Sequence, residues 1–175
     1  MIGMYYQLKR RIYILCSIIV DMTVLFIYRR DLRVHDNIGL NKAINLCKDN
    51  NEKLLPIFIF TPEQITNKNT YKSNNAILFM INSLKELSKV QYFYGTNEDV
   101  LTNIFKKRNI NHLVFNTDTT PYAQKRDSDI IKLCKKFDIC DHVCQDYNLH
   151  DLSLIKTGAG SDYEVFTPFF NKASK

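Results

Sequence analysis

TVLFIYRRDLRVHDN, residues 23–37, is the stretch from which the fold can be argued. Its first six residues form a nearly continuous apolar run of strand length, which is typical of a strand buried on both faces of a parallel sheet. Residues 28–37 then hold three arginines, two aspartates and a histidine. Ligands of open parallel sheets bind outside the carboxyl ends of the strands. The charged loop is therefore a candidate functional site.

Strand-like and helix-like patterns alternate along the rest of the chain. Further strands are expected at 54–60, 90–94, 112–116 and 142–146. Apolar stripes at helical spacing, interpreted as core, lie between the strands at 40–47, 77–87, 100–105 and 130–137. The alternation predicts an α/β fold, with a five-stranded parallel, doubly wound (Rossmann-like) sheet and helices on both faces.

The pattern places the boundaries of one α/β domain at residues 22–150. Residues 1–21 are interpreted as a non-core N-terminal extension, and residues 151–175 as a C-terminal tail that begins an interdomain linker. Within the extension, the apolar run 12–20 is too short to span a bilayer and has no small-residue cleavage site, so no membrane association is expected. An upstream start codon and a membrane anchor are the alternatives for this segment.

The charged loop also has a purely structural interpretation. Asp31 would accept charge-assisted hydrogen bonds from Arg29, Arg30 or Arg33. Asp36 or Asn37 would cap the helix that follows. Asp31, Arg33, Asp36 and Asn37 are therefore expected to hold the loop in shape, whether or not a ligand binds beside it.

Charge, cysteine content and the absence of phosphate-binding motifs bear on which ligands and partners the chain could have. The net charge of +6 permits an anionic partner, but a solvated lysine-rich surface explains it equally. Five cysteines form no disulfide framework, which indicates reduced thiols in the cytoplasm or nucleus. Cys140, His142 and Cys144 would share one face of a strand, where burial is favoured over metal binding because no second ligand pair accompanies them. Neither GxGxxG nor GxxxxGK[ST] occurs, and GAG at 158–160 is expected to be a flexible turn.

Several motifs, in order, resemble the DNA photolyase/cryptochrome family. The loop matches its pattern R-x-D-L-R-x-x-D-N, and later segments are similar to its SL-x-x-L helix, its N-x-D-x-x-P-Y-x-x-x-R-D segment and its Y-x-V-F-T-P-F segment. The segments of this chain that carry the resemblance are YRRDLRVHDN (28–37), LLPIFIF (54–60), NAILFMINSLKELSK (75–89), NTDTTPYAQKRDSDI (116–130) and YEVFTPFF (163–170). The resemblance as a whole covers residues 23–173.

The resemblance implies an N-terminal α/β antenna domain. In that family such a domain holds a light-harvesting deazaflavin, folate or flavin at the carboxyl edge of its sheet. The residues of this chain implied to line the chromophore pocket are Tyr28, Arg29, Arg30, Phe60, Thr61, Glu63, Asn116, Asp118 and Tyr122. Asp118 would pair with a ring N–H, and Arg30 would neutralise an acidic tail. Tyr122-Ala123 stands where folate-binding members carry Asn-Glu, which favours the deazaflavin-type branch over folate.

The resemblance also implies which parts of a photolyase would lie outside this α/β domain. Family members continue into a helical domain that binds FAD and the damaged base pair, and FAD is the electron donor for repair. This chain alone is therefore expected to lack repair activity and to meet DNA only indirectly. It would be the antenna half of a split photolyase with a separate FAD-binding helical subunit, or a truncated inactive form. An independent nucleotide- or flavin-binding module without photochemistry is the alternative.

Three phenylalanines near the C-terminus are expected to form a docking surface. Phe166, Phe169 and Phe170 lie close together in an otherwise polar tail. Clustered exposed apolar side chains mark interaction sites. They would bind the helical subunit or join two copies of this chain in a homodimer.

Overall fold

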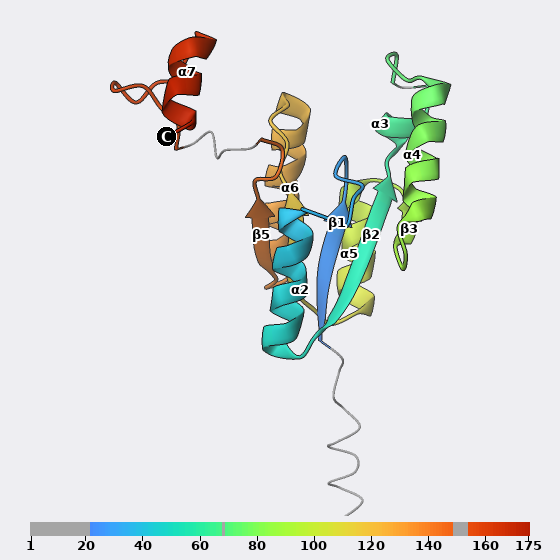
Figure 1. The fold of residues 1–175 in the computed structure, drawn as a ribbon. Coiled ribbons are helices and arrows are strands. Elements are labelled where there is room, and N and C mark those ends of the chain that lie inside the picture. The colour runs from blue at the N-terminus through green and yellow to red at the C-terminus, as the bar shows by residue number, and fades with distance from the viewer. Residues whose placement is uncertain (1–21, 68, 149–153) are drawn as a thin grey trace, which may run out of the picture.

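The protein contains one five-stranded parallel sheet (Figure 1). The computed structural model describes residues 22–67, 69–148 and 154–175. Its strands stand in the order β3-β2-β1-β4-β5. They are β1 (Thr23–Tyr28), β2 (Lys53–Phe60), β3 (Gln91–Tyr94), β4 (Ile110–Asn116) and β5 (Cys140–Cys144). The strand order reverses between β1 and β4, which is where ligands of such sheets bind.

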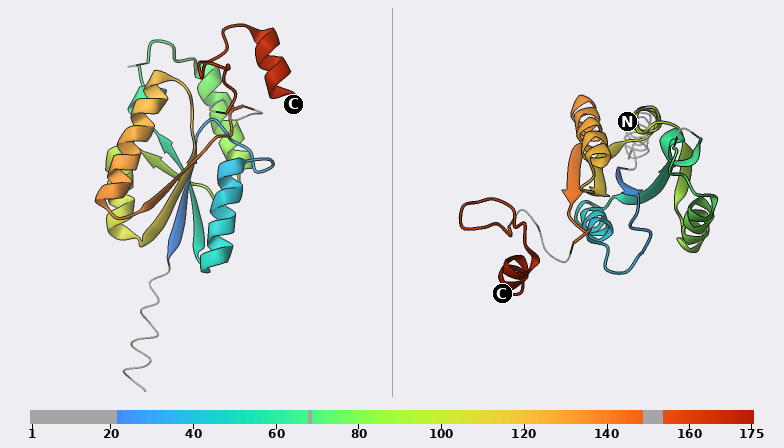
Figure 2. Two further views of the ribbon diagram at one scale, coloured as in Figure 1. Left: turned by 90° about the vertical axis from the view of Figure 1, so that its left-hand side faces the viewer. Right: turned by 90° about the horizontal axis from the view of Figure 1, so that it is seen from above.

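Helices cover both faces of this sheet, as Figure 2 shows. α2 and α4 pack on one face, while α5 and α6 pack on the other. The helices are α2 (Ile38–Asn50), α3 (Pro62–Ile65), α4 (Asn74–Glu86), α5 (Asn97–Lys107), α6 (Pro121–Lys136) and α7 (Phe166–Ala173). The predicted α/β, doubly wound parallel sheet is confirmed.

The alternation of side chains along β1 explains the two layers. Leu25 and Ile27 join the core under α5 and α6, whereas Val24, Phe26 and Tyr28 join the core under α2 and α4. All six residues of β1 are buried, because the strand is central and covered on both faces. A strand that is covered on both faces needs apolar side chains at every position, which explains the continuous apolar run of β1.

The last strand differs from the prediction. β5 covers residues 140–144 rather than 142–146, and Asp146 lies beyond its end. β5 is an edge strand paired only with β4, so its side chains are partly exposed and give no continuous apolar run. Cys140 is exposed, contrary to the expected burial, while Cys144 packs against the α2 side.

The apolar stripe expected within 77–87 is the core-facing side of α4. Leu84 is fully buried, and Met80 and Leu87 pack against the same core. The N-terminal half of α4 rises past the carboxyl ends of the strands in Figure 1, and Leu78 and Phe79, which lie off the stripe, are 58% and 74% exposed. α7 was not predicted, because Pro168 and the short length of the tail gave no helical period. Pro168 lies in its first turn, where a proline is tolerated.

The described residues contain neither a membrane-spanning helix nor a metal-binding group of side chains. None of their helices has the length and apolar character needed to cross a membrane. Within the same part of the chain, no three His, Cys, Asp or Glu side chains are grouped to hold a metal ion. The extension 1–21 lies outside the described residues.

Candidate functional site

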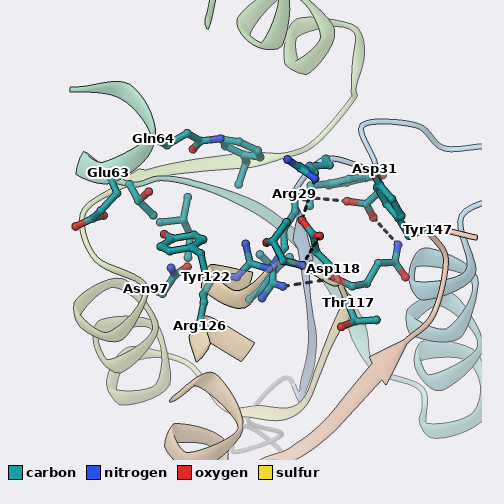
Figure 3. Close-up of a pocket in the computed structure, with 18 of the residues that line it drawn as sticks. Arg29, Asp31, Glu63, Gln64, Asn97, Thr117, Asp118, Tyr122, Arg126 and Tyr147 are labelled. Atoms are coloured by element: carbon teal, nitrogen blue, oxygen red, sulfur yellow. Dashed lines mark hydrogen bonds and ion pairs between the residues drawn. The ribbon is translucent and has the colours of Figure 1, made fainter. Parts of the chain in front are cut away.

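A cavity of about 850 Å³ opens at the carboxyl edge of the sheet (Figure 3). Segments that follow β1, β2, β4 and β5 all contribute to its wall. The pocket residues expected from the sequence that line it are Tyr28, Arg29, Arg30, Thr61, Glu63, Asn116, Asp118 and Tyr122. Phe60 does not line it, because its ring packs against Phe58 and Tyr92 at centroid distances of 4.9 and 6.2 Å. Ligand binding by these residues stays a prediction.

Arg29 is the most deeply placed cation of the site. Its Nη1 lies 2.5 Å from Asp127 Oδ1, and its guanidinium stacks 4.2 Å from the centroid of Phe115. Burial lowers the pKa of Arg29 to about 10, assisted by the neighbouring charge of Arg126 and opposed by Asp127. The group remains a cation at neutral pH, held by the carboxylate and the aromatic ring.

One carboxylate serves two arginines at this point. Arg126 Nε donates to the same Asp127 Oδ1 at 2.9 Å, and Thr117 Oγ1 donates to Oδ2 at 3.4 Å. The Nη2 atoms of Arg29 and Arg126 are buried without a hydrogen-bond partner among the described residues. The cluster therefore carries one positive charge that Asp127 does not neutralise.

Arg30 and Asp118 form a second ion pair at the mouth of the cavity. Arg30 Nη1 lies 3.1 Å from Asp118 Oδ2, with side chains 64% and 12% exposed. Asp118 Oδ1 accepts a hydrogen bond from the backbone N–H of Thr120, the N-cap of α6. An anchored carboxylate beside an exposed cation can meet both a ring N–H and an acidic substituent of a ligand.

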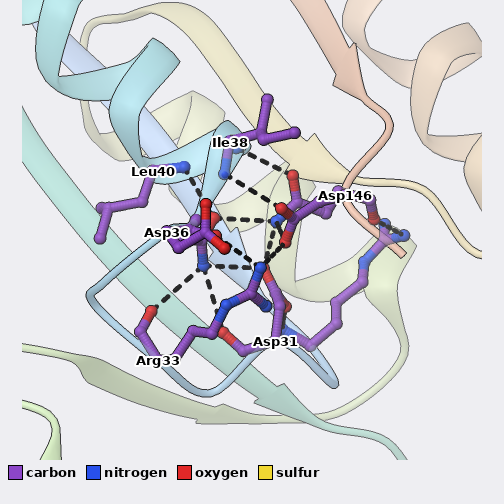
Figure 4. A network of polar contacts seen from close by, with 10 residues as sticks. Asp31, Arg33, Asp36, Ile38, Leu40 and Asp146 are labelled. Carbon is purple, nitrogen blue, oxygen red and sulfur yellow. Dashed lines mark hydrogen bonds and ion pairs between the residues drawn. The ribbon is translucent and has the colours of Figure 1, made fainter. Parts of the chain in front are cut away.

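The charged loop after β1 organises the start of α2 (Figure 4). The first three backbone N–H groups of α2 each find a side-chain acceptor: Ile38 donates to Asp146, Gly39 to Asn116 and Leu40 to Asn37. Free N–H groups at a helix start otherwise need water or a ligand. The structural interpretation of the loop therefore accounts for Asn37, which is the N-cap.

Within the described part of the chain, the Asp31 carboxylate accepts from the backbone of Arg29 and not from an arginine guanidinium. It also accepts hydrogen bonds from the side-chain amides of Asn37 and Asn116. Arg33 instead pairs with Asp146 at 2.7 Å and donates to the Asp36 carbonyl oxygen. Asp36 is not the cap; it turns the chain at φ 53°. Arg33 reaches Asp146, which follows β5, because β1 and β5 end at the same edge of the parallel sheet.

Asn116 connects the cavity to this network. Its Oδ1 accepts from Gly39, and its Nδ2 donates to Asp31, Asn37 and Asp146. The residue is 5% exposed. Its hydrogen-bonding groups are thus occupied by the protein, and its contribution to a ligand would be to fix the floor of the cavity.

Aromatic side chains supply flat surfaces around the opening. Tyr28 is buried in the floor, where burial and the nearby charge of Asp31 raise the pKa of its phenol. Tyr71, Tyr122 and Tyr147 are 95%, 55% and 60% exposed and line the cavity wall. Such faces suit the stacking of a planar heterocycle.

The sequence interpretation missed three functional positions, Arg126, Asp127 and Asp146. Asp127 lies inside a helix and Asp146 just after an edge strand, positions that look like ordinary surface in a sequence. The only available signal was the Arg-Asp pair of the matched segment 116–130.

Comparison with known proteins identifies the family. The sequence model of the family "DNA photolyase" matches residues 24–175. The chain belongs to the DNA photolyase family. A deoxyribodipyrimidine photo-lyase from Buchnera aphidicola is 29% identical over 155 residues, which are 83% of this chain and 31% of that protein. Cryptochrome-1 from Aedes aegypti is 31% identical over 122 residues, covering 64% of this chain and 22% of the other.

A solved structure extends the comparison. An archaeal photolyase from Sulfolobus tokodaii, crystallised with two FAD molecules, is 38% identical with a TM-score of 0.74, over 86% of this chain and 34% of that one. This photolyase-family chain thus corresponds to the N-terminal α/β domain and spans about a third of the length of these photolyases.

Proposed function

We propose that this domain binds a planar, light-absorbing heterocycle of the flavin or deazaflavin type and serves as the antenna part of a photolyase or cryptochrome. The observation that carries the proposal is the cavity at the carboxyl edge, with Asp118 anchored beside Arg30 and tyrosine rings around the opening. Its volume falls within the range of roughly 300–1,000 Å³ typical of small-molecule sites.

The residues present fit such a group. The ring system would lie between the tyrosine faces, a ring N–H would donate to Asp118, and an acidic substituent would meet Arg30. The bound chromophore would supply absorption of near-ultraviolet or blue light. The archaeal photolyase with two FAD molecules, whose structure implies a novel light-harvesting cofactor, supports a flavin in this role.

The absorbed energy would pass to a flavin-binding helical part such as the photolyase family carries. In this proposal that part is supplied by a separate subunit, and the DNA contacts belong to it. Co-purification of the chain with a helical FAD protein would support the arrangement. Two proteins that remain separate at micromolar concentration would contradict it.

The first experiment is a near-ultraviolet and visible absorption titration of the purified chain with riboflavin, FMN, FAD, a deazaflavin and a reduced folate. We expect saturable binding of a flavin or deazaflavin, with a perturbed absorption band. Asp118→Asn should weaken binding about tenfold, because the substitution removes a charge-assisted hydrogen bond worth roughly 1.5–3 kcal/mol. Tyr122→Ala should weaken it by removing a stacking face.

Two matched variants control for general effects. Asp49→Asn replaces a carboxylate by an amide on the exposed surface of α2 and controls for Asp118→Asn. Tyr94→Ala removes a 64% exposed tyrosine that does not line the cavity and controls for Tyr122→Ala. Both should bind like the unmodified chain. An unmodified chain that binds none of the five compounds would refute the proposed function. Selective binding of ATP without any flavin would support the independent nucleotide-binding module instead.

A further inference from the structure

Exposed cations gather where the ends of α5 and α6 meet. Because both helices connect parallel strands, each ends at the amino edge of the sheet, opposite the cavity (Figure 2). Phe105 of α5 and Phe137, which follows α6, hold the two ends together with ring centroids 5.4 Å apart. The cations around this contact form the cationic face of the protein, which consists of Lys106, Lys107, Arg108, Lys135 and Lys136.

The protein does not neutralise this face within its described part. Lys125 and Lys132, earlier on α6, both pair with Asp129, whereas no carboxylate pairs with a cation of the face. Arg108 donates to a neutral side-chain amide at 3.1 Å. The negative ends of the two helix dipoles together offset about one elementary charge. Asp138, in the exposed turn after α6, offsets one more. Several positive charges therefore remain for an anionic partner.

The start of β1 adjoins the cationic face. Asn109, the residue after Arg108, accepts a hydrogen bond from the Thr23 N–H at 3.0 Å, and its side-chain amide donates to Met22 Sδ at 3.0 Å. Residues 1–21 precede this point and lie outside the described residues. Their sequence adds an apolar run at 12–20 and, ahead of it, the cations Lys9, Arg10 and Arg11. The sequence that leads into the amino edge is therefore both basic and apolar.

These features fit a lipid surface better than a nucleic acid. Phe105 is 9% exposed and Phe137 is partly buried, so neither ring of the helix contact is free to stack on a nucleic-acid base. Anionic lipids attract clustered lysines and arginines without any need for stacking. Stable attachment to a membrane takes two signals, such as a basic patch together with an apolar group. The cationic face and the run 12–20 supply one of each.

We propose that the cationic face binds an anionic phospholipid surface, with the apolar run 12–20 as the second contributor. Residues 1–21 then act as a membrane anchor, the alternative to an extension without membrane association. The cavity opens at the carboxyl edge, and α7 lies beyond that edge in Figure 1, so contact through the amino edge leaves both accessible. Membrane binding is thus independent of the proposed function and compatible with it.

Co-sedimentation of the full chain with lipid vesicles is the first test. We expect binding to vesicles with equal parts of phosphatidylcholine and phosphatidylglycerol, and at least tenfold weaker binding to phosphatidylcholine alone, because the face requires lipid charge. Raising the salt concentration from about 0.05 to 0.5 M should weaken binding to the anionic vesicles. Equal binding to the two kinds of vesicle, or binding to neither, would overturn the proposal. Binding of a DNA duplex without binding of vesicles would also overturn it and would assign the face to nucleic acid.

Charge reversal on the face identifies the contact. Lys107→Glu with Lys135→Glu should weaken binding to the anionic vesicles at least tenfold. Lys172→Glu with Lys175→Glu makes the same charge change at exposed positions of the C-terminal tail and should bind like the unmodified chain. All four positions are exposed, so circular dichroism spectra of both variants should match that of the unmodified chain. Equal binding by the two variants would show that the cationic face is not the contact.

A third variant separates the apolar run from the charge. Ile14→Ser with Ile18→Ser, made in the full chain, removes apolar side chains from the run 12–20 and leaves the net charge unchanged. Binding to the anionic vesicles should weaken at least tenfold, because less apolar surface leaves water, and should keep its salt dependence. Unchanged binding would overturn the role given to the run 12–20.

Discussion

Gly39 shows how a single residue holds the helix start against the sheet. A Cβ at this position would lie 2.5 Å from Asn116 Oδ1 and 3.0 Å from the Phe26 ring. The close approach allows the Gly39 N–H to donate to Asn116 at 2.9 Å. Gly39→Ala must displace Asn116, which also bonds Asp31, and we expect a loss of about 1–3 kcal/mol in the free energy of unfolding. Urea unfolding followed by circular dichroism measures the loss.

Gly158→Ala is the matched control, since nothing lies within 4 Å of the added Cβ. It should change the free energy of unfolding by less than about 0.5 kcal/mol. Unfolding midpoints that coincide for the Gly39→Ala and unmodified proteins would show that Asn116 can move freely and that the network does not hold α2.

At this scale the sequence identified the charged residues but not their partners. Arg29 and Arg30 were predicted to line the pocket and Arg33 to hold the loop. Their carboxylate partners are Asp127, Asp118 and Asp146, respectively. Asp118 follows β4, Asp127 lies in α6 and Asp146 follows β5. Pairing between such distant residues depends on strand order and register, which local pattern does not encode.

At the scale of elements, β4 and β5 are joined by a histidine pair as well as by their backbone ladder. His112 Nδ1 and His142 Nε2 lie 3.1 Å apart, and one ring nitrogen donates a hydrogen bond to the other. Burial lowers the pKa of His142, helped by the charges of His112 and Lys42 and opposed by Asp141. The unfolded chain, with an ordinary pKa near 6.5, therefore binds protons more readily than the folded chain.

The lowered pKa of His142 makes the folded state less stable at acidic pH. The contribution of His142 is fully present above pH 6.5 and is lost as the pH falls below it, because protonation favours the unfolded chain. Thermal unfolding midpoints recorded from about pH 7.5 to 5.5 should fall in the unmodified protein and fall less in His142→Gln. His35→Gln, on an exposed loop residue, should follow the unmodified protein. A curve for His142→Gln as steep as that of the unmodified protein would contradict the assignment.

Most strands could be predicted from their apolar runs. β1, β2 and β4 lie in the middle of the sheet, and their apolar runs gave their positions closely. β5 at the edge was placed two residues too late. The apolar stripe within 77–87 indicated both the helix α4 and its core-facing side, where Leu84 is buried and Met80 packs against the core.

At the scale of the whole molecule, α7 presents an apolar face to solvent. Phe166 and Phe170 are 72% and 53% exposed, and their rings stack at a centroid distance of 5.7 Å. Phe169 is half-buried against Tyr163, with centroids 6.3 Å apart. A short helix with such a face gains stability by burying it against a second surface. The surface expected in the isolated chain is α7 of another copy, because a twofold contact brings like faces together.

Self-association through α7 gives a concentration-dependent solution mass. Sedimentation velocity should show species heavier than 20.6 kDa as the concentration rises. Replacing Phe166, Phe169 and Phe170 by serine should leave a monomer, because the apolar area that drives association is removed. Leu78→Ser with Phe79→Ser removes comparable exposed apolar area on α4 and should still self-associate. If the triple variant retains the heavier species, the contact between copies lies elsewhere. If the unmodified chain stays at 20.6 kDa, α7 does not join two copies and would instead bind a different protein.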